Sequence, residues 1–370
     1  MKVRNAPFLF VALALVLLAP PVTRPLSAQP ARLVAIPIDQ APVLNGLATE
    51  DVWKQAPVFT LSTQGVGKWG AVNKSQTPVQ LQAVYTRDTL YVLARWKDPT
   101  HSLDRQRWVF DGRTWQLDDQ TPLERGGAST AYEDKLAFLW VMRSPSVVQK
   151  GTFYPTYVEQ DAAAKYGYER PVKTMPQGER LDMWHWKLVR TAFTVPAQVD
   201  DQYVDDKIDA RTAPNAGRQT DPQDPAVPGG YYDNVKQFTA PDGSRVRGPR
   251  FYIPGNRNLL VLTQPMIARG WAKEITDYAE LMSLPAGTKV PGVIGRPFSG
   301  HRADITAGHT WINGTYALEI ARKFNTGDPE HDVIFDDLTK PYYFGVAVFD
   351  NTQIGHAASD AFPMVFQKRQ

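Results

Sequence analysis

The 370-residue sequence contains no cysteine, and this absence excludes several kinds of redox and metal centre. Without thiols there is no disulfide, no thiolate zinc site, no cysteine-ligated iron–sulfur cluster and no C-x-x-C-H attachment of a haem. Any redox group must therefore be held by other side chains and without a covalent thioether link.

The chain also lacks a large excess of charge of either sign. The formal net charge is +3 and no basic run is present, so the sequence gives little support for nucleic-acid binding. No nucleophile–base pair or closed metal site stands out, and we expect a protein that is not an enzyme on its own. The 30 prolines and 10 tryptophans instead predict long ordered loops and many aromatic surfaces.

A long hydrophobic run occurs only near the N-terminus. Lys2 and Arg4 precede an apolar run over 8–19, and a small-residue site follows at 26–28. The run is shorter than the about 20 apolar residues that cross a bilayer, so a cleaved signal peptide is favoured over a retained anchor. We expect residues 1–28 to be removed on export, leaving a periplasmic mature chain, 29–370, with no membrane span.

Short alternating segments dominate the rest of the chain. Apolar residues alternate over 79–85 and 90–96 around a turn at Arg87-Asp88, and again over 135–142. Further strands are predicted over 316–320 after the hairpin turn Asn313-Gly314, over 344–349 and over 362–366. With no βαβ alternation, this pattern predicts an all-β fold, an antiparallel β-sandwich.

The stretch from about 144 to 302 has a different composition, rich in Pro, Gly, Asp and Tyr. We interpret it as loop insertions in a single sandwich domain, because no separate hydrophobic pattern closes a core within it. Ordered loops of this length usually have a function, and we expect 200–254 to dock on partner subunits. The pairs Asp200-Asp201 and Asp205-Asp206 lack the spacing of a calcium loop and are expected to be a solvated run.

The densest chemical cluster is Trp184-His185-Trp186-Lys187, with Met175 upstream. Met, His and Lys side chains beside flat aromatic rings suit a haem held without covalent attachment. Strand alternation predicts that Trp184 and Trp186 share one face while His185 and Lys187 share the other. All five are candidates for contact with the cofactor.

Several separated stretches together resemble one family. They are 134–137, 181–187, 200–203, 311–316 and 344–350. In this order they resemble the haem-binding γ subunit of ethylbenzene dehydrogenase and related complexes of the type II dimethyl-sulfoxide-reductase family. The opening segment, 38–56, resembles sandwiches related to family 9 carbohydrate-binding modules and DOMON domains, a group that binds sugar or haem.

The resemblance implies one non-covalent haem b, clamped between loops by two axial side chains, a Met and a Lys in the ethylbenzene dehydrogenase type. Some relatives add a c-type haem in the loop that corresponds to 151–175, but here the cysteines are missing. The implied function is electron transfer in the periplasm. The implied partners are a molybdenum-containing catalytic subunit, an iron–sulfur subunit and a soluble c-type cytochrome, as in nitrite oxidoreductases, chlorate or selenate reductases and hydrocarbon dehydrogenases.

Met175 and His356 are the predicted axial ligands of the haem iron. Met175 corresponds to the family's methionine ahead of the Trp-His-Trp-Lys motif, and the alternative is a methionine that fills a gap under the loop. His356 lies where relatives place their lysine, and the alternative is an exposed loop histidine. Three residues are held in reserve: Met142, which is expected in the core; His185, otherwise a hydrogen-bonding residue; and Lys187, otherwise a partner of a haem propionate.

Other readings stay open. The remaining histidines have polar or turn-like neighbours and are expected at the surface: His101, His301, His309 and His331. A carbohydrate-binding module would use the same sandwich and present tryptophans such as Trp69, Trp108 and Trp115 to sugar rings. A haem-free adaptor subunit is the third possibility.

Overall fold

The computed structural model describes 31–65, 77–118, 132–143, the backbone of 157–158, 172–213, 216–227, 229–256, 260–353 and 355–369. The chain divides into two units, Met1–Pro30 and Ala31–Gln370, and the described residues all belong to the second. The expected signal peptide, 1–28, and Trp69 lie outside the described residues.

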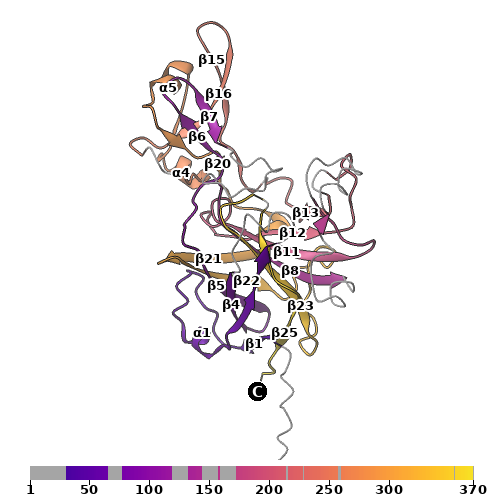
Figure 1. Ribbon diagram of the computed structural model, residues 1–370. Helices are drawn as coiled ribbons and strands as arrows, with labels where there is room; N and C mark the ends of the chain where they lie inside the picture. Colours follow the sequence, from indigo (N-terminus) through magenta and orange to yellow (C-terminus); the bar gives the residue numbers. More distant parts are fainter. Residues whose placement is uncertain are drawn as a thin grey trace, which may run out of the picture. The chain divides into compact units, whose positions relative to one another are not determined.

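Fourteen strands join in one sheet (Figure 1). They are β1 (Leu33–Pro37), β2 (Phe59–Ser62), β3 (Gln64–Gly65), β4 (Pro78–Tyr85), β5 (Thr89–Lys97), β8 (Lys135–Arg143), β11 (Arg180–Lys187), β12 (Asp200–Val204), β13 (Arg218–Thr220), β21 (Ile305–Ile312), β22 (Thr315–Lys323), β23 (Tyr342–Phe349), β24 (Ala357–Ala358) and β25 (Phe362–Phe366). The main path runs β13-β12-β11-β8-β23-β25-β1-β4-β5-β22-β21, with β2 beside β4 and β24 between β23 and β3.

This sheet folds over so that its two halves pack face to face. A single buried cluster takes alternate side chains from β4, β5, β21 and β22 in one half and from β8, β11 and β23 in the other. The ring of Trp186 on β11 lies 5.9 Å from Trp96 on β5 and 5.7 Å from Tyr316 on β22, centroid to centroid. The predicted all-β sandwich is therefore confirmed.

Strand pairing agrees with the alternation in the sequence, with one exception. β4 pairs with β5 and β21 with β22 as antiparallel hairpins, and Asn313 (φ 50°) and Gly314 (φ 72°) form the predicted turn. β1 is the exception, because it pairs in parallel with both β25 and β4. It is the strand that connects the two halves of the sandwich.

Helices are short and few in the described part of the chain. They are α1 (Asp51–Gln55), α4 (Gln264–Ala268), α5 (Tyr278–Ser283) and the 3₁₀ turn η4 (Gly300–Ala303). α1 places Trp53 on the outer side of β4 and β5, where its indole donates a hydrogen bond to Glu319 (2.8 Å). None of the helices described is long and apolar enough to cross a bilayer.

The remaining strands form small sheets of their own. They are β6 (Arg107–Phe110), β7 (Trp115–Asp118), β9 (Tyr157–Val158), β10 (Val172–Lys173), β14 (Tyr232–Asp233), β15 (Lys236–Thr239), β16 (Arg245–Gly248), β17 (Phe251–Tyr252), β18 (Lys273–Glu274), β19 (Lys289–Val290) and β20 (Val293–Ile294). One cluster packs Trp108 against Phe238 and Leu281, and another contains Phe251 and Ile294.

These clusters correct the expectation that no core closes within 144–302. Their apolar residues come from segments far apart in sequence, including 107–115, which precedes that stretch. A local hydrophobic periodicity therefore does not predict these clusters. The same stretch also contains β11 and β12, which belong to the main sheet. The region is thus partly sandwich and partly insertion.

Candidate functional site

β11 presents two chemically different faces. Because side chains alternate along a strand, Met183, His185 and Lys187 point away from the sandwich interior, while Trp184 and Trp186 point into it. This separation was predicted. The two tryptophans were also predicted to contact the cofactor, but both are buried in the core between the sheets, so they are not part of the outer face that carries His185.

Met175 lies on the outer face of the β8–β11–β12 part of the sheet. It is 4% exposed and packs with Leu139, Leu181, Met183 and Val204. Its backbone N–H donates to the carbonyl of Asp205 (2.9 Å), which fixes the segment over the sheet. The thioether is therefore held in an apolar layer beside β11.

His356 lies directly before β24 and on the same side of the sheet. It is 4% exposed, which excludes the alternative of an exposed loop histidine. Its ring stacks on Phe349 (4.8 Å between centroids), and Phe349 in turn stacks on His185 (5.6 Å). The structure thus brings His356, His185 and Met175 to one face of the sheet.

Alanine side chains from β8, β23 and β24 also lie on the outer face beside His185. Register pairs His185 with Ala137 on β8, Ala137 with Ala347 on β23, and Ala347 with Ala358 on β24. This row of alanines packs with Phe349, whose ring contacts both His185 and His356 on the same face.

His185 has one nitrogen without a partner. Its Nδ1 lies 3.1 Å from Oε1 of Gln202, an acceptor, so Nδ1 carries the proton and Nε2 has a free lone pair. Nε2 is buried and forms no hydrogen bond. Burial, and then the charges of Lys187 and Lys135, hold the pKa of His185 well below its ordinary value. A buried neutral imidazole with an open lone pair is the form in which histidine binds metals.

Lys187 is already paired. Its ammonium group forms a buried ion pair with Asp200, which also accepts from Nη2 of Arg302 (3.0 Å). Burial lowers the pKa of Lys187 to about 8 although Asp200 acts in the opposite direction. Burial alone would raise the pKa of Asp200, but Lys187 and Arg302 together lower it to about 2. A haem propionate would have to share Lys187 with this carboxylate.

The expected solvated run at Asp200-Asp201 is wrong. Both side chains are fully buried, and Asp205 is nearly so. The reason is that β12 lies between β11 and β13, an inner position in the sheet that the composition of the segment does not reveal. Asp206, by contrast, is exposed.

Two methionines complete the set. Met142 is partly buried against the core between the sheets, as expected. Met183 was not singled out from the sequence, yet it is buried beside Met175 on the same face as His185. Counting two residues back from His185 along the strand would have found it.

The other histidines were expected at the surface. The side chain of His301 is 39% exposed, which agrees, whereas three are half-buried: His101, His309 and His331. His101 stacks on Trp311 (5.1 Å), and the ring of His309 lies 5.3 Å from Trp186. Burial, followed by the neighbouring His101, lowers the pKa of His309 to about 4.

Trp108 and Trp115 are not platforms for sugar rings. They are 4% and 7% exposed, and their indole N–H groups donate to the carbonyls of Asn234 (2.7 Å) and Leu281 (3.1 Å). The carbohydrate-binding reading therefore loses the two of its three named tryptophans that the structure describes.

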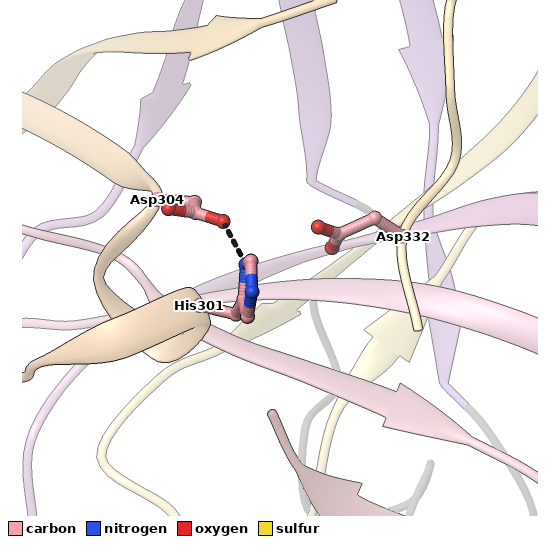
Figure 2. A group of neighbouring side chains, drawn as sticks. All are labelled: His301, Asp304 and Asp332. Carbon is pink, nitrogen blue, oxygen red and sulfur yellow. Dashed lines mark hydrogen bonds and ion pairs between the residues drawn. The ribbon is translucent and has the colours of Figure 1, made fainter. Parts of the chain in front are cut away.

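Carboxylates gather on the inner side of β11 and β12. Oxygen atoms of Asp182, Asp201 and Asp332 lie within 4.8 Å of one another. Asp332 also faces His301 and Asp304, whose side chains are joined by a 3.0 Å hydrogen bond (Figure 2). This grouping cannot be predicted from local sequence patterns, because Asp332 lies in the loop that follows β22, far in sequence from Asp182 and Asp201.

The fold and the outer face define a β-sandwich with buried thioether and imidazole side chains along one strand. A family model described as Ethylbenzene dehydrogenase matches residues 50–361, and the chain belongs to this family.

Two solved structures are similar to this chain at low sequence identity. A family 9 carbohydrate-binding module from Caldicellulosiruptor kristjanssonii in complex with cellotriose is 8% identical, with 92% of this chain and 95% of that chain covered and a TM-score of 0.31. The module in complex with glucose is 10% identical, with coverages of 91% and 97% and a TM-score of 0.30. No curated protein matches the chain.

Proposed function

We propose that the protein is a periplasmic electron-transfer subunit that carries one non-covalent haem b on the outer face of β8, β11 and β23. The observation that carries the proposal is the unpartnered Nε2 of His185, buried on the face that also holds Met175 and His356. Membership of the ethylbenzene dehydrogenase family supports it.

The residues of this face fit the group. A thioether and neutral imidazoles are iron ligands, and bound haem supplies a one-electron redox couple. Met175 and His356 are the proposed axial pair, with His185 as the competing ligand. Lys135 is buried beside Phe349 on the same face, with its side-chain nitrogen 4.2 Å from that ring, and burial holds the pKa of this lysine well below its ordinary value.

The partners proposed are a molybdenum-containing catalytic subunit, an iron–sulfur subunit and a soluble c-type cytochrome, with the chemistry on substrate performed by the first. Exposed apolar side chains in and near the long loops suit such contacts, notably Val195, Val227 and Trp271. If 200–254 docks on partners, limited proteolysis should cut it faster in the isolated subunit than in the complex. Equal cleavage in both would count against docking.

Spectroscopy of the purified protein tests the cofactor. We expect a Soret band and a pyridine haemochrome of haem b, with one haem per chain. Absence of any haem, in protein purified from a host that makes it in excess, would overturn the proposal and leave the carbohydrate-binding and adaptor readings. Mass analysis of the periplasmic protein tests export, for which loss of residues 1–28 is expected.

A further inference from the structure

A second cluster of ligand-type side chains lies on the inner side of the sheet and has no role in the proposed function. Asp182 is on β11, Asp201 on β12 and Asp332 in the loop after β22, and Asp221 follows β13 directly. All four carboxylates are buried, with exposed fractions of 0%, 0%, 1% and 2% respectively.

Their charge is not balanced by basic side chains. Nη2 of Arg322 on β22 lies 3.3 Å from Asp182 and 2.9 Å from Asp332, and its Nε lies 3.9 Å from Asp201. Among the described residues, no other ion pair reaches these four carboxylates. One guanidinium therefore faces three of the carboxyl groups, and the fourth, Asp221, has no ion pair among the described residues.

Asp201 and Asp221 have no hydrogen-bond partner on either carboxylate oxygen, and Oδ1 of Asp182 has none either. An unpaired buried carboxylate is strongly unfavourable, so the group must either take up a proton or meet a cation.

We propose that Asp182, Asp201 and Asp332 bind a divalent cation of the Ca²⁺ type between the two halves of the sandwich. The donors are all oxygen atoms, which hard cations prefer. Ligands on opposite sides of Ca²⁺ are about 4.6–5.2 Å apart, twice the usual Ca–O distance. The three carboxylates, within 4.8 Å of one another, match that span. The cation joins β11 and β12 of one half to the loop that follows β22 of the other.

Two other carboxyl groupings are weaker candidates. In the group of Figure 2, His301 already bonds Asp304, and these side chains are 39% and 27% exposed. In the group of Asp98, Asp134 and Asp350, the oxygens of Asp134 accept hydrogen bonds from Ser102, Tyr316 and Asn351. Neither contains a carboxylate that is both fully buried and wholly unpartnered.

Calorimetric titration of the EDTA-treated mature protein with Ca²⁺ is the first test. We expect one Ca²⁺ per chain, and at about 100 times Kd a rise in melting temperature of about 5 °C. Tb³⁺ gives a local readout, because the indole of Trp184 donates to Asp182 (3.1 Å) and lies close enough to sensitise a bound lanthanide. Absence of Ca²⁺ binding to the wild-type protein overturns the proposal.

Asp201→Asn separates a cation site from a merely structural cluster, because the two effects have opposite signs. The amide removes an uncompensated charge, so the EDTA-treated variant should melt higher than wild type, while its affinity for Ca²⁺ and Tb³⁺ should fall at least tenfold. Matched controls are Asp304→Asn and Asp98→Asn, which remove one carboxylate from each competing group and should bind as wild type does.

Retained binding in Asp201→Asn overturns the proposal, and loss of binding in either control assigns the cation to that group instead. The haem spectrum serves as an independent check of folding, since EDTA should leave it unchanged.

Discussion

The two faces of β11 differ in the chemistry that they offer. Toward the outside, Met183 and His185 join Met175 to give sulfur and neutral nitrogen donors in an apolar layer. Toward the inside, Asp182 and its neighbour Asp201 on β12 give only oxygen donors, beside Arg322. Alternation along β11 thus places sulfur and nitrogen donors on one face of the strand and oxygen donors on the other.

The largest expected effect follows from removing the imidazole of His356 from the outer face. If His356 is an axial ligand as proposed, replacing it by Ala should lower haem occupancy or leave an open high-spin site, because its imidazole is lost. Absorption and electron paramagnetic resonance spectra of the purified variant measure both. His101→Ala is the matched control, since His101 stacks on Trp311 at the other side of the core, and it should keep the wild-type spectrum.

If His356→Ala keeps the low-spin spectrum while His185→Ala loses it, the axial imidazole belongs to His185 and its unpartnered Nε2. The cofactor assignment would survive, and the assignment of His356 would not.

A second prediction concerns the buried ion pair of Lys187 and Asp200 on the outer face. Asp200→Asn leaves Lys187 and Arg302 without their shared carboxylate and should cost about 3–5 kcal/mol of unfolding free energy at pH 7. Because the pKa of Asp200 is lowered in the fold to about 2, its contribution is fully present above its unfolded value of 3.8 and is lost as the pH falls through 2. Denaturant unfolding at pH 7 measures the loss. Asp209→Asn, at an exposed turn, should change little.

The features of the fold and the site that the sequence predicts are those that depend on residues close together in the chain. Alternation over 135–142 and 181–187 predicted both the strands and the opposite faces of Trp184 and His185, because side-chain direction follows from neighbours in the chain. The buried position of Asp200 depends on Lys187 and Arg302, which are 13 and 102 residues away. No local pattern carries that information.

The same limit applies to the candidate sites. Met175 and His356 were found by resemblance to a family, and His356 reaches the outer face only because β24 pairs with β23. Asp332 joins Asp182 through the packing of the two halves of the sandwich. Trp108 and Trp115 looked like surface platforms because the residues that bury them, such as Phe238 and Leu281, follow more than a hundred residues later.

The third prediction concerns the donor atom at position 175 on the outer face, where an imidazole nitrogen replaces the thioether sulfur. Met175→His should keep the haem but lower its midpoint potential by on the order of 0.1 V, a fraction of the ~0.8 V range that axial ligands span. Redox titration followed at the Soret band measures the shift. Met364→Leu, in the core between the sheets, is the matched control. An unchanged potential in Met175→His would exclude Met175 as a ligand and direct attention to Met183.

The smallest expected effect concerns His309, which is half-buried on the side of β11 opposite to His185. His309 packs against Trp186 on the inner side, where burial and His101 lower its pKa to about 4, below the unfolded value of 6.5. Between pH 6.5 and 4, His309 binds a proton in the unfolded chain but not in the folded protein. The free energy of unfolding therefore falls as the pH is lowered through this window. His309→Gln should remove up to about 2 kcal/mol of that loss, while changing stability at pH 8 much less. Denaturant unfolding of both proteins at pH 4.5 and pH 8 measures the difference. Identical pH dependence would show that His309 accepts its proton in the folded state, and the acid sensitivity would then have to come from another group, with His185 on the outer face as the first to test.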